Sequence, residues 1–323
     1  MTGILLIQLG TPDKPTYGGL FPYLRQFLSD RRVIEVPRAI WLPLLYLRIL
    51  PFRSGASAAK YARIWHPETG SPLMSYTIRQ TDLLKARFPD NPVRFGMIVG
   101  NPALRKVLTE MVDSGVDKLI AMPMFPQYSA TSFASATDSL FTALTKLRRV
   151  PAVRVVPPYY DHPGYLDALE AVIRDDLAKL PWEPEHIVIS FHGIPKKYAQ
   201  RGDPYATHVV RTTQALVKRM GWPRSLWTQT YQSRFGKSPW LKPYTDDVLE
   251  ALAKKGTKRV YVALPGFTAD CLETIDEIGL ESREVFEHAG GEHLKNGTCL
   301  NDHPQWIEGM ERIIRDEGHG WLK

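Results

Sequence analysis

The sequence predicts an α/β protein with two similar halves, each a parallel β-sheet flanked by helices. Three observations support this fold class. Apolar, β-branched runs, each closed by Gly or Pro, alternate with longer segments of helical period, which is the pattern of βαβ units. Residues 117–123 and 258–265 repeat one pattern, a buried strand that ends in Pro and precedes a polar segment. The 323 residues are 44% apolar and 23% charged, an ordinary globular composition.

Six strands follow from these runs, three in each half. They begin near Ile4, Val93, Lys118, His186, Leu226 and Arg259. Residues 151–163 hold four prolines and are the expected crossover between the halves. We expect two domains, residues 1–155 and 156–304, and a C-terminal helix over 305–323 that packs back on the first domain. Because ligands of open parallel sheets bind beyond the carboxyl ends of the strands, residues that follow the strands are the candidates for a site.

The sequence predicts a cytoplasmic protein. The longest apolar stretch, residues 39–47, contains a proline and ends at Arg48, whereas a spanning helix needs about 20 residues. Residues 1–9 lack the basic start and the cleavage site of a signal peptide and predict a buried strand. Two cysteines, Cys271 and Cys299, are too few for a disulfide framework or a four-cysteine metal site, so a reducing compartment fits best.

The charge is unevenly distributed along the chain. The net charge is +7, and residues 1–161 carry 20 basic against 11 acidic residues, whereas the remainder is slightly acidic. The basic residues form no run longer than two, so nucleic acid is not an expected partner. Ordinary solvated charge explains the asymmetry; a ligand with carboxylates at one side and a cation at the other is the functional alternative.

Several common motifs are absent from the sequence. No predicted strand is followed by G-x-G-x-x-G, and the chain contains no H-E-x-x-H, C-x-x-C or G-x-S-x-G. Dinucleotide binding, the commonest zinc sites and serine hydrolysis through a nucleophile elbow therefore have no support.

A stripe of carboxylates is the most unusual feature of the second half. Residues 270–287 contain seven acidic residues and one basic residue. At an α-helical 100° per residue, five acids fall within an arc of roughly 80°. They are Asp270, Glu273, Glu277, Glu281 and Glu284. A solvated helix face is one explanation; the other is a track of oxygen ligands that accepts a divalent cation or relays protons.

His192 ends the apolar strand of residues 187–191 and precedes Gly193, a residue that lets a ligand approach the backbone closely. A hydrogen-bonded core histidine is the plain alternative. We favour a functional role because His192 lies at a strand end, where it can exchange protons near neutral pH or ligate a metal.

Seven motifs, taken together, resemble the landmarks of bacterial ferrochelatases in family order. They are residues 9–13 (LGTPD), 27–33 (FLSDRRV), 70–73 (GSPL), 126–129 (PQYS), 190–195 (SFHGIP), 231–236 (YQSRFG) and 265–274 (PGFTADCLET). The similarity continues through residues 283–291 and covers nearly the whole chain. Each motif alone is weak, whereas the set is highly specific.

This resemblance implies two Rossmann-like domains of the chelatase type around a porphyrin cleft. It also implies a lyase that inserts Fe²⁺ into protoporphyrin IX, the final step of haem synthesis, with protoporphyrin IX and ferrous iron as partners. No cofactor is expected beyond the substrate iron. The [2Fe–2S] cluster of some members is not expected, because two cysteines cannot supply four ligands.

The resemblance also implies roles for individual residues. His192 and Glu273 match the catalytic and metal-binding pair, and Glu277 and Glu281 continue the carboxylate row. Positions near the porphyrin propionates are matched by Arg53, Gln232, Ser233 and Arg234, and positions that line the pocket by Phe125 and Tyr128. We hypothesise that His192 accepts pyrrole protons, that Glu273 guides iron or protons, and that Glu277 and Glu281 conduct them.

The sequence departs from the family pattern at three places. Gln8 stands where Asn is usual. Ile98 and Val99 stand where Arg-Tyr is common, so a basic residue there is missing. Cys271 stands where some members carry His, and it is either a soft ligand or a small buried residue.

Residues 41–52 resemble the family's mobile lip over the porphyrin entrance. A buried amphipathic helix and an exposed apolar lip explain this segment equally well. As a lip it would touch the inner face of the cell membrane peripherally, without spanning it.

Three other functions remain open from the sequence. A related chelatase would act on coproporphyrin or on another tetrapyrrole and metal. A non-catalytic tetrapyrrole-binding protein would need a cleft but no base. A Ser–His–Asp hydrolase would use His192 with one of the many serines.

Overall fold

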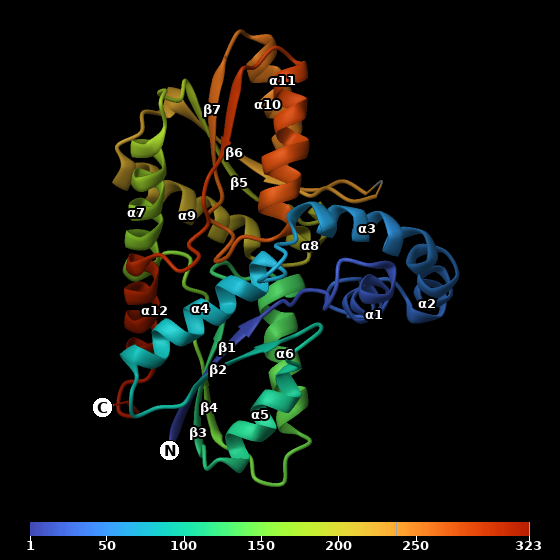
Figure 1. Cartoon of the computed structure of the whole chain (residues 1–323), viewed down its shortest axis with the longest axis vertical. Helices are drawn as coiled ribbons and strands as arrows, with labels where there is room; N and C mark the ends of the chain where they lie inside the picture. Colours follow the sequence, from blue (N-terminus) through green and yellow to red (C-terminus); the bar gives the residue numbers. More distant parts are fainter. Residues whose placement is uncertain (237, 323) are drawn as a thin grey trace. The chain divides into compact units, whose positions relative to one another are not determined.

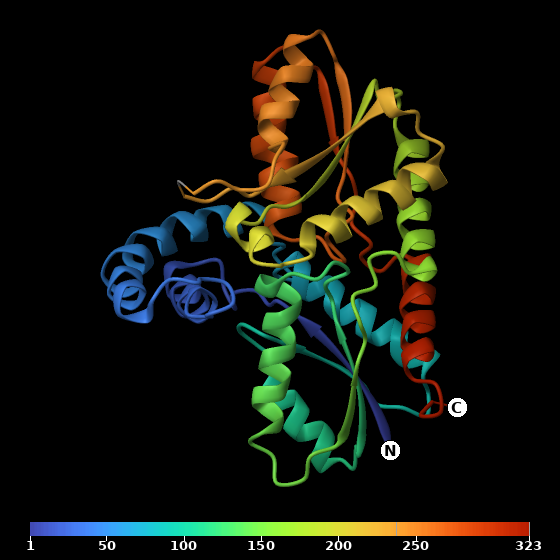
Figure 2. The same ribbon diagram turned by 180° about the vertical axis from the view of Figure 1, so that it is seen from behind.

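The computed structural model describes residues 1–236 and 238–322 and contains two parallel sheets of four strands each. The strand orders are β2-β1-β3-β4 and β6-β5-β7-β8, and helices flank both sheets (Figures 1 and 2). The predicted α/β fold class is therefore confirmed. The chain divides into two compact units, which are described separately: unit 1 is residues 1–158 with 310–323, and unit 2 is residues 159–309.

Unit 1 begins with a strand, and helices separate its four strands. Its elements are β1 (Thr2–Gln8), α1 (Tyr17–Leu28), α2 (Arg38–Leu44), the π-helix η1 (Leu45–Ile49), α3 (Leu50–Ile64), α4 (Pro72–Arg87), β2 (Val93–Met97), α5 (Leu104–Asp113), β3 (Lys118–Pro123), the π-helix η2 (Ala130–Ala134), α6 (Ser135–Leu144) and β4 (Ala152–Val155).

Unit 2 repeats the alternation of helices and strands. Its elements are α7 (Pro163–Lys179), β5 (His186–His192), α8 (Lys196–Gln200), α9 (Tyr205–Met220), the 3₁₀-helix η3 (Arg224–Leu226), β6 (Trp227–Gln232), α10 (Thr245–Lys254), β7 (Arg259–Ala263), the π-helix η4 (Glu273–Ser282), α11 (Arg283–His288), β8 (His293–Asn296) and the first part of α12 (Pro304–Glu317).

The structure contains all six predicted strands and two more, β4 and β8. Strand β4 lies inside residues 151–163, which the sequence predicted to be only a crossover. Strand β8 lies at residues 293–296. Each is four residues long, lies at the edge of its sheet and carries a basic residue. Both are shorter than the runs of five to seven residues from which the other six strands were predicted.

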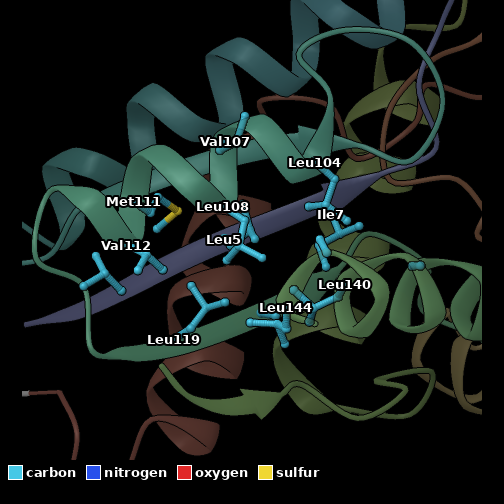
Figure 3. Packing of buried hydrophobic residues seen from close by; sticks show 14 residues of the cluster. Leu5, Ile7, Leu104, Val107, Leu108, Met111, Val112, Leu119, Leu140 and Leu144 are labelled. Atoms are coloured by element: carbon cyan, nitrogen blue, oxygen red, sulfur yellow. The ribbon is translucent and has the colours of Figure 1, made fainter. Parts of the chain in front are cut away.

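One face of the first sheet forms the main core of unit 1. Helix α5 places Leu104, Leu108 and Met111 on one side at helical spacing, and these residues pack against Leu5 and other residues of β1 and β3. Figure 3 shows this packing together with α6. Strand β1 is buried along its whole length, as expected for the interior of a parallel sheet covered by helices on both faces.

Gly10 lies two residues after the end of β1, and its backbone geometry requires glycine. Its φ is +113°, and a Cβ atom would lie 1.7 Å from the Val99 carbonyl oxygen. The substitution Gly10→Ala is expected to lower the free energy of unfolding by about 3 kcal/mol, because it combines backbone strain with a clash. Urea unfolding of the purified protein measures this effect.

Gly55→Ala is the matched control, because Gly55 lies within α3 at an exposed position where a Cβ would meet no atom within 4 Å. This variant should gain about 0.5–1 kcal/mol from helix propensity. Equal urea midpoints for the two variants would contradict the account of Gly10.

The end of the chain packs on the sheet of unit 1. The Arg154 guanidinium of β4 donates to the carbonyl oxygens of Glu317 and His319, both at 2.8 Å, and lies 4.2 Å from the centre of the Trp321 ring. The Thr2 hydroxyl donates to the Trp321 carbonyl oxygen at 3.0 Å. These contacts fix residues after α12 beside β1 and β4.

The segment α2–η1–α3 is helical and partly apolar on its outer surface. Trp41, Leu45 and Leu50 are buried, whereas Leu47 and Phe52 are 79% and 77% exposed. This helical segment therefore has a buried side and an exposed apolar side. It has features of both alternatives, the buried amphipathic helix and the exposed apolar lip. Among the described residues, no helix has the length and apolar character needed to cross a bilayer.

Candidate active site

The ends of β5 and β6 bring the central residues of the candidate site together. These strands pair in parallel so that His192 lies beside Gln232. The Gly193 N–H donates to the Gln232 carbonyl oxygen at 2.8 Å, which extends the pairing by one residue. A Cβ on Gly193 would lie 2.9 Å from that oxygen, so Gly permits this close approach.

The His192 ring is held by its own backbone neighbour. Its Nδ1 lies 2.7 Å from the Gly193 carbonyl oxygen, and a carbonyl can only accept a hydrogen bond. This geometry assigns the proton of the neutral ring to Nδ1 and leaves the Nε2 lone pair as the basic atom. The Tyr205 hydroxyl donates to the His192 carbonyl oxygen at 2.8 Å and holds the backbone. His192 is partly exposed, so it is not the buried core histidine that the sequence left as the alternative.

The Glu277 carboxylate accepts hydrogen bonds from both residues at the end of β6. Ser233 donates to it twice, from the backbone N–H to Oε1 and from the hydroxyl to Oε2, both at 2.6 Å. The Gln232 side-chain amide donates to Oε2 at 3.5 Å and to the Glu273 carbonyl oxygen at 2.9 Å. The end of β6 is thereby bonded to the first turn of η4.

Burial raises the pKa of the Glu277 carboxyl above its usual value. The Ser233 hydroxyl and the charge of a protonated His192 lower it, and the neighbouring Glu273 raises it further. The His192 ring is thus close enough to affect the pKa of the Glu277 carboxyl. A perturbed carboxyl of this kind is a candidate functional group.

The acidic row differs from the helical stripe that the sequence predicted. Glu273, Glu277 and Glu281 lie on a π-helix, whose i→i+5 hydrogen bonds replace the α-helical spacing, and all three are partly buried. Asp270 precedes the helix, and its carboxylate accepts hydrogen bonds from Thr274 at 2.7 Å and Asn301 at 2.6 Å. Asp270 is therefore a structural residue at the start of η4.

Glu284 follows η4 on α11 and is exposed. The solvated-face explanation holds for Glu284 and fails for the three acids of η4. The row is consequently three carboxylates long rather than five.

The two cysteines are thiols at this site. Burial, and then the charge and a hydrogen bond of Glu273, raise the pKa of the Cys271 thiol well above its usual value, and burial does the same for Cys299. A protonated thiol is a poor metal ligand. Within residues 1–236 and 238–322, no three His, Cys, Asp or Glu side chains are grouped closely enough to hold a metal ion.

Three predicted substrate residues belong to unit 1. Arg53 lies on α3 and is partly buried, and this burial lowers the pKa of its guanidinium. Phe125, which follows β3 in the chain, is partly buried and packs against the hydrophobic core of unit 1. The Tyr128 ring lies 5.5 Å from that of Phe133. Arg234, in unit 2, is exposed and lies over the Tyr244 ring at 4.5 Å.

Ile98 and Val99, which depart from the family pattern, are apolar parts of unit 1. Val99 is buried and its N–H donates to the Leu9 carbonyl oxygen at 2.9 Å. Ile98 packs against the core, and its carbonyl oxygen accepts from the Gln26 side chain at 2.9 Å. These residues supply packing where a basic side chain is common.

A buried set of hydroxyls behind the site was missed by the sequence analysis. The Ser190 hydroxyl donates to the Gln232 side-chain oxygen at 2.9 Å and lies 2.9 Å from the Thr245 hydroxyl. The first of these bonds fixes the Gln232 amide so that its NH₂ group faces η4. The available signal was Ser190 itself, a polar residue inside an otherwise apolar strand.

Two solved chelatases share the fold of this chain. SirB from Bacillus subtilis with Fe³⁺ has a TM-score of 0.59 at 12% identity, covering 98% of this chain and 96% of that chain. The sirohydrochlorin chelatase SirB from Bacillus subtilis subspecies spizizenii in complex with cobalt has a TM-score of 0.56 at 10% identity, covering 98% and 94%. The fold is therefore that of the chelatases.

The family follows from the sequence comparisons. The family model described as Ferrochelatase matches residues 1–318. The ferrochelatase of Mesorhizobium japonicum is 47% identical over 99% of this chain and 92% of its own, and that of Pectobacterium atrosepticum is 44% identical over 97% of each. The chain belongs to the ferrochelatase family, as its motifs predicted.

Proposed function

We propose that this protein is a ferrochelatase, a lyase that inserts Fe²⁺ into protoporphyrin IX and releases two protons, in the last step of haem synthesis. Membership of the ferrochelatase family supports this function. The observation that carries the chemistry is the His192 ring, whose Nδ1 is held by the Gly193 carbonyl oxygen so that Nε2 is its basic atom, together with the Glu277 carboxylate that Ser233 binds.

Insertion of a metal into a porphyrin requires a base and weak ligands. The two pyrrole N–H groups must lose their protons, and the cation must shed its water before it reaches the ring nitrogens. In this proposal the Nε2 atom of His192 accepts the pyrrole protons. Glu273 guides the substrate iron, and Glu277 and Glu281 carry protons away along η4. Oxygen ligands that form no closed cage suit a cation that must be released.

The porphyrin would be held at its edges and by its faces. The Arg53 and Arg234 guanidiniums are suited to the propionate carboxylates. The family resemblance also places Gln232 and Ser233 near the propionates, but the polar groups of these two side chains already bond to Glu273 and Glu277. The rings of Phe125 and Tyr128 are suited to pack against a flat macrocycle.

Anaerobic mixing of the purified protein with ferrous iron and protoporphyrin IX tests this function. The Soret band should change to that of protohaem at a rate proportional to protein concentration. Parallel reactions with coproporphyrin, and with cobalt or nickel, separate a related chelatase from the proposed one by relative kcat/KM. Porphyrin binding without insertion of any metal would indicate a tetrapyrrole carrier and contradict the proposal.

We propose further that the protein is cytoplasmic and touches an anionic membrane peripherally through residues 41–52. Residues 38–63 contain five basic residues and no acidic residue, and the exposed apolar side chains of this segment lie among them. A helical surface with both features inserts shallowly into a headgroup layer. Porphyrins partition into bilayers, so this contact would place the protein near its substrate.

Replacing Leu47 and Phe52 by serine is expected to reduce co-sedimentation with phosphatidylglycerol vesicles several-fold, because these side chains are 79% and 77% exposed. Ile78→Ser with Leu83→Ser is the matched control, because these residues of α4 are 42% and 43% exposed outside the lip. Equal vesicle binding by both double variants would overturn the membrane contact.

A further inference from the structure

Gln232 and Ser233, at the end of β6, both donate hydrogen bonds to the Glu277 carboxylate. Ser233 has a left-handed backbone, with φ +64°, which is uncommon for a residue other than Gly. This conformation aims its N–H at Glu277 Oε1 while its hydroxyl reaches Oε2. Both oxygens of one carboxylate are therefore engaged by a single residue.

A carboxylate held at both oxygens has one orientation. The Glu277 side chain contains three rotatable bonds and would otherwise sample several rotamers. Two short hydrogen bonds to a charged acceptor are among the stronger contacts in proteins. Left-handed strain at a serine persists only where the surrounding contacts compensate for it, and here the compensating partner is Glu277.

The neighbouring residue supports the same arrangement. Gln232 is 4% exposed, and its amide is oriented by the Ser190 hydroxyl so that it donates to the Glu273 carbonyl oxygen and, at 3.5 Å, to Glu277. The two consecutive residues thus fix the first turn of η4 to the strand that pairs with the His192 strand.

We infer that Ser233 is a positioning residue that fixes the orientation of the Glu277 carboxylate on η4, rather than a residue whose main partner is a porphyrin propionate. This inference rests on the proposed function, since it assigns Ser233 a part in metal insertion. It makes a specific distinction: Ser233 acts on turnover through Glu277 and contributes little to porphyrin affinity.

A double-mutant cycle with Ser233→Ala and Glu277→Gln tests the inference. The single change Ser233→Ala should lower kcat about ten-fold, as expected for one hydrogen bond to a charged group, and leave the KM for porphyrin within two-fold. In the Glu277→Gln background the same change should lower kcat by less than two-fold, because its target is already altered. Ser233→Gly, which also lacks the hydroxyl but relieves the strain, should match Ser233→Ala.

Porphyrin titration without iron, followed by absorbance, provides a readout independent of turnover. The positioning role predicts an unchanged Kd for Ser233→Ala. A five-fold or larger rise in Kd, or effects on kcat that multiply in the double variant, would overturn the inference in favour of a propionate contact. Ser225→Ala, an exposed serine in η3, controls for the substitution, and thermal unfolding confirms that each variant is folded. A wild-type protein that inserts no iron would instead refute the proposed function itself.

Discussion

The variant His192→Ala is expected to lower the rate of iron insertion by about 100-fold or more, the range that a general base contributes. The reason is that Nδ1 is engaged by the Gly193 carbonyl oxygen, so Nε2 is the ring atom available to take pyrrole protons. Alanine leaves no base at this position. Single-turnover insertion, followed by the Soret band under anaerobic conditions, measures the rate.

Porphyrin binding should survive this change, because the imidazole acts on the ring centre and the proposed affinity comes from the ring edges. A Kd for protoporphyrin IX within a few-fold of the wild-type value is therefore expected. His288→Ala is the matched control, because His288 is exposed at the end of α11. This variant should insert iron at the wild-type rate. Near-normal insertion by His192→Ala would remove His192 from the chemistry.

The variant Glu277→Gln is expected to have the second-largest effect, a fall in kcat of about 30- to 100-fold. Glutamine keeps the size of the side chain but carries no charge and cannot take a proton. It also places an NH₂ group where the Ser233 N–H and hydroxyl now donate, so one donor loses its acceptor. The loss of the proton-accepting group and the disturbed orientation both slow proton removal.

Glu284→Gln is the control for Glu277→Gln, because it makes the same chemical change on the same acidic segment at an exposed position. It should retain the wild-type kcat and KM within two-fold. If both variants lose activity equally, the relevant property is the overall charge of residues 270–287 and not the bound carboxylate.

Much of the fold could be predicted from the sequence, because buried parallel strands are continuous apolar runs. Strand β1 is such a run and is buried throughout. Strands β4 and β8 could not be found in this way, because a short edge strand is selected by the neighbour that it pairs with and not by its own composition.

The candidate site was predictable in its residue types and less so in its geometry. His192 and the acids follow strand ends, where parallel sheets place ligands. The extent of the acidic row was wrong, because an α-helical period was applied to a segment that forms a π-helix and because Asp270 bonds to Asn301, 31 residues away.

The bond from Ser233 to Glu277 also lay beyond the sequence. It joins residues 44 positions apart and depends on a left-handed backbone at a residue that rarely adopts one. Local sequence patterns carry no information about a contact of this kind. The family resemblance identified both residues, and the structure shows that they contact each other.

The account depends on His192 and Glu277 acting as one proton-accepting pair, and the double variant His192→Ala/Glu277→Gln tests this most directly. Residues that act as a unit have strongly non-additive effects on rate. The single-turnover rate of iron insertion by the double variant should equal that of His192→Ala within about two-fold. A rate lowered by the full product of the two single effects would show that the residues act independently and would contradict the account.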